Sequence, residues 1–118
     1  MNAVFVGAVS GFVAVALGAF GAHGLKGRLT PEALQTFEVG VRYQLIHALA
    51  LLLVGLLAAR GPTTALTVAG WCFLSGTLLF SGSLYGLSLT GIRAFGPITP
   101  IGGVAFLAGW AALAKSAL

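Results

Sequence analysis

Long apolar runs separated by short polar connections dominate the hydrophobic pattern of this chain. The runs predict four membrane-spanning helices, at about residues 2–22, 43–59, 64–90 and 100–116, because about 20 mostly apolar residues are needed to cross the hydrocarbon core. The connections are short, so consecutive helices are expected to run in opposite directions. The pattern therefore predicts an all-α integral membrane protein, a four-helix antiparallel bundle built as a single transmembrane domain.

The first run carries a second pattern, of small residues. Residues 2–22 contain no charged side chain. A cleaved signal peptide would have a positively charged start and a shorter apolar core, so we expect this run to be retained as a helix. Its small residues recur every three or four positions, at Gly7, Gly11, Ala14, Gly18 and Ala22. One face of the helix is therefore nearly bare backbone and is expected to pack closely against a neighbour.

The polar segment between the first two runs predicts a short helix of its own. Thr30 is suited to cap this helix and Pro31 to occupy its first position. Apolar residues then recur on one face, at Leu34, Phe37 and Val41. We expect an amphipathic helix at the level of the lipid headgroups, over about residues 31–41, with a bend at Gly40 leading into the second span.

The third and fourth runs contain further local signals. The third is longer than a straight span requires, so a tilt or a bend near Ser81–Ser83 is expected. Trp71 and Tyr85 lie toward its two ends, as in an aromatic belt. The fourth helix is expected to begin with Thr99 as its cap and Pro100 at its first position.

Composition supports the membrane assignment. Hydrophobic residues make up 58% of the chain and charged residues 7%, against about 25% charged in soluble domains. The net charge of +4 comes from scattered side chains without a basic run, which argues against nucleic acid as a partner. Cys72 is the only cysteine. It therefore forms no internal disulfide and is expected to be a buried structural thiol.

The cations are distributed unequally between the two ends of the predicted bundle. The end that holds the first and third connections carries four of them, Lys26, Arg28, Arg42 and Arg93. The opposite end carries Arg60 and Lys115. The positive-inside rule therefore predicts that the more basic end faces the cytoplasm and that both termini lie outside, in a bacterial cytoplasmic membrane.

Candidate chemistry gathers at the basic end. A polar cluster is predicted from six residues, Glu38, Arg42, Gln44, His47, Ser81 and Tyr85. The acid–base spacing of four residues favours a Glu38–Arg42 ion pair. His47 is either a proton acceptor or ligand, or a neutral side chain satisfied by a neighbouring helix. Because the apolar run begins at Leu45, His47 is expected only about 3 Å below the membrane surface.

A second candidate site is the start of the fourth helix. Free backbone amides at a helix start favour an anionic group such as a lipid phosphate. The residues predicted to form this site are Lys26, Arg93, Thr99, Gly102 and Gly103. The alternative is an ordinary capped helix start with water on its amides.

Other site classes lack a supporting pattern. His23 and His47 fall on separate elements without metal-ligand spacing, so no metal site is predicted. No nucleophilic triad, phosphate-binding loop or dinucleotide fingerprint occurs. We therefore expect no catalytic residue, no cofactor and no enzymatic activity.

Several motifs resemble those of a known family. They are GAFGAHGLK at residues 18–26, the pattern F-x-x-G-V-R-Y-Q-x-x-H-A-L-A from Phe37, FSGSLY at residues 80–85, and GPITPIGG followed by Gly109–Trp110. They are similar to the small membrane family called domain of unknown function 423, whose animal members are called transmembrane protein 256. The resemblance covers essentially the whole chain. It implies a multi-helix membrane protein and implies no particular chemistry.

Two functional hypotheses follow. The leading one is a non-enzymatic membrane protein that acts by packing with a partner membrane protein, further copies of itself or anionic lipids. The alternative is a small transporter or channel with a polar site around His47 and Arg42. Transporter sites usually place polar groups near the midplane of the bilayer, which disfavours this alternative when His47 is expected near the surface.

Overall fold

A computed structural model describes all 118 residues, and the chain is all-helical. Its helices are α1 (Ala3–Phe20), α2 (Pro31–Arg60), α3 (Thr64–Gly76), α4 (Gly82–Thr90) and α5 (Ile98–Ser116). Single π-helical turns follow α1 (η1, Gly21–Leu25) and join α3 to α4 (η2, Thr77–Ser81), and a short 3-10 turn precedes α5 (η3, Arg93–Phe95). Four continuous helical segments are long and apolar enough to cross a membrane. This confirms the predicted all-α class and the number of candidate spans.

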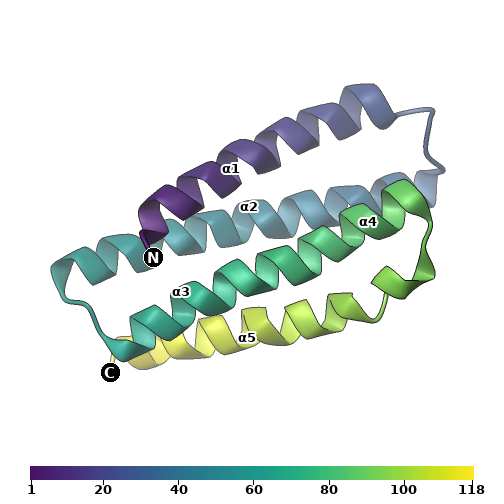
Figure 1. The fold of residues 1–118 in the computed structure, drawn as a ribbon. Coiled ribbons are helices and arrows are strands. Elements are labelled where there is room, and N and C mark those ends of the chain that lie inside the picture. Colours follow the sequence, from purple (N-terminus) through teal and green to yellow (C-terminus); the bar gives the residue numbers. More distant parts are fainter.

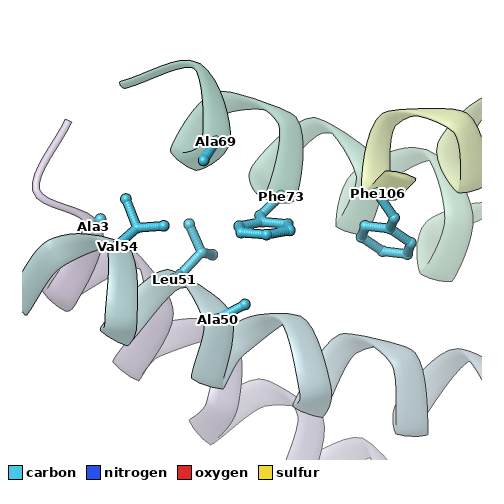
Figure 2. Packing of buried hydrophobic residues seen from close by; sticks show 7 residues of the cluster. All are labelled: Ala3, Ala50, Leu51, Val54, Ala69, Phe73 and Phe106. Carbon is cyan, nitrogen blue, oxygen red and sulfur yellow. The ribbon is translucent and has the colours of Figure 1, made fainter. Parts of the chain in front are cut away.

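The four segments lie side by side, each next to its neighbours in the arrangement. In Figure 1, α1 lies along α2, α2 along the α3–α4 segment, and α3 along α5. The molecule is elongated and rather flat, with extents of 48 × 26 × 18 Å. The main cluster of buried hydrophobic residues includes Ala3 from the first turn of α1, which joins Val54 of α2 and Phe73 of α3 (Figure 2). The α1 helix thus packs mainly against α2, and the antiparallel bundle stays a prediction.

Contacts between α1 and α2 depend on glycine. A Cβ atom at Gly7 would lie 2.8 Å from the carbonyl oxygen of Ala48. A Cβ atom at Gly21 would lie 2.9 Å from the ring of Phe37. Such close approach of helix backbones is typical of small-residue faces in membranes. The small-residue face of the first helix thus packs closely, as predicted, and its partner is α2.

The predicted interfacial helix is not a separate element. Thr30 caps α2 as expected, because its hydroxyl oxygen accepts a hydrogen bond from the Ala33 N–H at 3.1 Å. From there α2 continues without interruption to Arg60, so the second span of residues 43–59 is only its later part. Phe37, on the apolar face of residues 31–41, is fully buried against the protein.

Gly40 has a different role from the bend that was predicted. It lies within regular helix, and a Cβ atom there would come within 2.8 Å of the Tyr85 ring. The glycine therefore allows α4 to approach α2. The irregularity of the third segment is η2, whose last residue, Ser81, is the first residue of the predicted bend at Ser81–Ser83.

Two further local predictions are corrected by the structure. The α5 helix begins at Ile98, with Pro97 before it, so Thr99 is not the helix cap and Pro100 is not its first residue. The Thr99 hydroxyl instead lies 2.6 Å from that of Ser83. Tyr85 is not an outward-facing belt residue, because its hydroxyl is hydrogen-bonded inside the protein.

Candidate functional site

Gln44 connects three helices through its side-chain amide. Its Nε2 donates to the carbonyl oxygen of Ser10 at 3.0 Å and, at 3.4 Å, to the Ser10 hydroxyl. Its Oε1 accepts a hydrogen bond from the Tyr85 hydroxyl at 2.6 Å. One buried side chain on α2 thereby links α1 to α4, two helices that are far apart in the sequence.

His47 makes a second polar link, from α2 to α5. Its Nδ1 lies 2.7 Å from the carbonyl oxygen of Tyr43, and its Nε2 lies 3.1 Å from Nε1 of Trp110. An indole N–H is only a donor, so Nε2 must be the acceptor. The proton of a neutral imidazole is then on Nδ1 and is donated to Tyr43. Both ring nitrogens are therefore engaged in the neutral form.

Aromatic side chains surround the His47 ring. Phe106 stacks on it, with ring centroids 3.5 Å apart and an interplanar angle of 6°. Phe73 lies at 5.6 Å and Trp110 at 5.8 Å between centroids, both inclined to the imidazole. Because stacked and inclined aromatic rings have preferred geometries, these neighbours fix the orientation that the hydrogen bonds require.

Serine hydroxyls provide two further links. Ser81 donates to the carbonyl oxygen of Gly40 at 2.7 Å, which joins η2 to α2. Ser83 donates to the carbonyl oxygen of Phe80 at 2.8 Å, so Thr99 is the donor in the Ser83–Thr99 contact between α4 and α5. No buried side-chain nitrogen or oxygen lacks a partner. Hydrogen bonds of this kind contribute about 0.6 kcal/mol each in membrane proteins, and at most about 1.7.

The polar links lie at mid-length of the helices. Ser10 is near the middle of α1, and Gln44 and His47 are near the middle of α2. The uncharged α1 segment runs beside α2 from Phe37 to Gly55. His47 therefore lies at mid-length of α2, and its depth below the membrane surface stays a prediction.

The remaining residues of the predicted cluster lie outside this network. Glu38 and Arg42 are exposed on α2, and the hydrogen bonds that connect the helices do not include them. The expected Glu38–Arg42 ion pair is not part of the structure. Four of the six predicted residues, Gln44, His47, Ser81 and Tyr85, are brought into interhelical hydrogen bonds.

The predicted anion site has a different geometry from the one expected. Lys26 and Arg93 are exposed on two different connections, which lie at the same end of the molecule (Figure 1). Gly102 and Gly103 lie inside α5 rather than at its start. Gly102 is buried, and a Cβ atom there would lie 2.8 Å from the Cα atom of Phe80. Close packing therefore accounts for this glycine.

Potential metal ligands are dispersed. His23 is exposed on η1, whereas His47 is buried between α2 and α5. No group of three or more His, Cys, Asp or Glu side chains occurs in the structure. Cys72 is a free thiol and is only half-buried, less than expected.

Sequence reasoning missed Ser10 and Trp110. Ser10 is the only polar side chain within α1, and a single hydroxyl in a long apolar run was the available signal. Trp110 lies inside its span rather than at an end. An indole N–H at such a place needs an acceptor, and this requirement was the signal for a buried partner such as His47.

Four apolar helical segments joined by neutral interhelical hydrogen bonds define a small α-helical membrane protein. The chain belongs to the family described as protein of unknown function (DUF423), whose sequence profile matches residues 17–103. This confirms the resemblance carried by the sequence motifs.

Relatives at nearly full length support the same membership. The UPF0382 membrane protein YwdK of Bacillus subtilis is 46% identical over 116 residues, which cover 98% of this chain and 94% of that protein. A UPF0382 membrane protein of Haemophilus influenzae is 49% identical over 108 residues, which cover 91% of this chain and 86% of that protein. No solved structure matches. The relatives are bacterial proteins named as membrane proteins, and their names indicate no enzymatic activity.

Proposed function

We propose that this protein is non-enzymatic and acts by associating with other components of the membrane: a partner membrane protein, further copies of itself, or anionic lipid. The observation that carries the proposal is that every buried polar side chain already has a hydrogen-bond partner within the protein, on its own helix or on a neighbouring one. They are used to hold the fold together. The surfaces that remain free to contact a partner or lipid are the outer faces of the helices and the exposed basic side chains at the ends.

The outer face of α1 is the surface that best fits a partner. This helix is fixed to α2 through its glycine face and leaves large side chains such as Phe12 and Val15 exposed. Phe12 is the most exposed of them, at 78%. Aromatic side chains are enriched in protein interfaces, and close packing between helices drives association in membranes.

Association is tested by cross-linking and native mass spectrometry of the full chain in mild detergent. We expect a defined oligomer, a co-purifying membrane protein or retained anionic lipid. If the α1 face is the contact, Phe12→Ala should reduce the cross-linked fraction, whereas Leu107→Ala, on the exposed face of α5, should leave it unchanged. A strict monomer with neither protein nor lipid bound would contradict the proposal.

We further propose that all four segments cross the cytoplasmic membrane in antiparallel order, with both termini outside. The exposed cations Lys26, Arg28 and Arg93 lie at the end that holds the first and third connections (Figure 1). The positive-inside rule favours the cytoplasm for that end. Anionic headgroups of the cytoplasmic leaflet would meet the same cations.

Cysteine labelling in intact cells tests this orientation. In a Cys72→Ser background, Gly61→Cys should react with a membrane-impermeant thiol reagent, because its connection lies outside. Ala94→Cys, at the basic end, should react only after the cells are permeabilised. Both positions are exposed on connections between helices, so local burial does not account for a difference. Labelling of Ala94→Cys alone in intact cells would reverse the proposed orientation.

A transporter or channel around His47 and Arg42 is the alternative function. It requires a polar group free to meet a proton or solute, whereas both His47 ring nitrogens are engaged and Arg42 is outside the polar network. We therefore favour association.

A further inference from the structure

A groove opens between α1 and the segment formed by α3, η2 and α4, with α2 at its floor. Its volume is about 420 Å³, within the range of about 300–1,000 Å³ typical of small-molecule sites. The walls are apolar, formed by Val6, Val9 and Val13 of α1 and by Leu74 and Leu78 opposite them. Because both walls belong to candidate membrane spans, the groove is open to molecules dissolved in the bilayer.

Four polar side chains also line this groove, Ser10, Gln44, Thr77 and Tyr85. Three of these have donated their protons within the protein: Thr77 to the carbonyl oxygen of Phe73, Gln44 to Ser10, and Tyr85 to Gln44. These three side chains are thus fixed in position by the fold.

Ser10 is the exception. Its hydroxyl oxygen is approached by Gln44 at 3.4 Å, but its own proton is donated to no group of the protein. Hydroxyls elsewhere in the helices, such as those of Thr77 and Ser88, donate to a carbonyl of their own helix. A hydroxyl proton without an acceptor is costly in an apolar medium. Ser10 therefore presents an open hydrogen-bond donor to the groove, at mid-length of the helices.

We propose that this groove binds a neutral amphiphile whose apolar chain carries a carbonyl group. The Ser10 hydroxyl would donate to that carbonyl, and the valine and leucine walls would hold the chain. A charged headgroup does not fit, because no charged side chain lines the groove and its floor is remote from the helix ends where phosphates lie. An isoprenoid quinone and a neutral acyl lipid such as diacylglycerol both have this chemistry. The proposal concerns a different surface from the outer faces above and does not depend on association.

Native mass spectrometry of the full chain in detergent tests the proposal with three probes: decylubiquinone, dioleoylglycerol and, as the charged probe, dioleoylphosphatidylglycerol. At least one neutral probe should bind more tightly than the charged one. Ser10→Ala removes the donor but keeps the backbone carbonyl that Gln44 uses, and should weaken neutral binding about three- to tenfold. Ser75→Ala is the matched control, since Ser75 is exposed and donates to its own helix.

A second variant keeps the test independent of the hydroxyl. Gly82 lines the groove, and a Cβ atom there would meet nothing within 4 Å. Gly82→Leu should therefore fold and fill the groove, abolishing neutral binding. Preference for decylubiquinone supports a quinone, and preference for dioleoylglycerol supports an acyl lipid. Equal binding of the charged probe, or neutral binding that survives both variants, would overturn the proposal.

Discussion

Gly102→Ala should destabilise the protein by about 1–3 kcal/mol, the usual cost of forcing extra atoms into a packed interior. A Cβ atom at this position would lie 2.8 Å from both Cα and Cβ of Phe80. The Cα atom belongs to the backbone of η2 and cannot rotate away, so α5 must move as a whole. Unfolding in detergent by increasing sodium dodecyl sulfate, followed by tryptophan fluorescence, measures the loss.

The neighbouring glycine provides the control. Gly103→Ala places its Cβ atom 4.0 Å from the nearest Phe80 atom, an ordinary contact. It should be neutral or stabilising by up to about 1 kcal/mol, because alanine favours helix over glycine. Both substitutions keep the backbone amide, so a difference between them reports packing and not anion binding at this turn. Equal unfolding midpoints would mean that α5 does not approach η2 this closely.

The helices could be predicted from the sequence because their signals are local. Apolar length defines the four candidate spans, and Thr30 with Pro31 defines the start of α2. The continuity of α2 could not be predicted in the same way. Charged residues such as Glu38 and Arg42 make its first half look interfacial, yet Phe37 on another face is completely buried. A hydropathy average combines all faces of a helix and carries no information about which other helices pack against it.

The candidate site shows the same limit. Helical spacing brought Gln44 and His47 together on α2, and both are buried in polar links. Their partners on α1 and α5, Ser10 and Trp110, depend on the register between helices that are distant in sequence. That register is set by backbone approach at glycines such as Gly7, which a periodic pattern does not specify.

His47→Ala should destabilise the protein by about 2–5 kcal/mol, the range for large-to-small substitutions in a packed core. The substitution leaves a cavity against Phe106, which stacks on the ring at 3.5 Å. It also leaves the partly buried Trp110 N–H without its acceptor, which adds a further cost. Unfolding in detergent by sodium dodecyl sulfate, followed by far-ultraviolet circular dichroism, measures the effect independently of Trp110 fluorescence.

A double-mutant cycle measures the coupling between His47 and Trp110. Trp110→Phe removes the N–H donor together with part of the ring and should cost about 1–2 kcal/mol. If the bond holds α5 to α2, His47→Ala and Trp110→Phe together should cost less than the sum of the single effects. Additive costs would mean that the two rings do not interact.

Proton and solute flux into liposomes should be the same for the wild type and folded His47→Ala. Flux lost only in that variant would instead favour a transport site, since a residue that serves only to join helices changes stability without changing permeability.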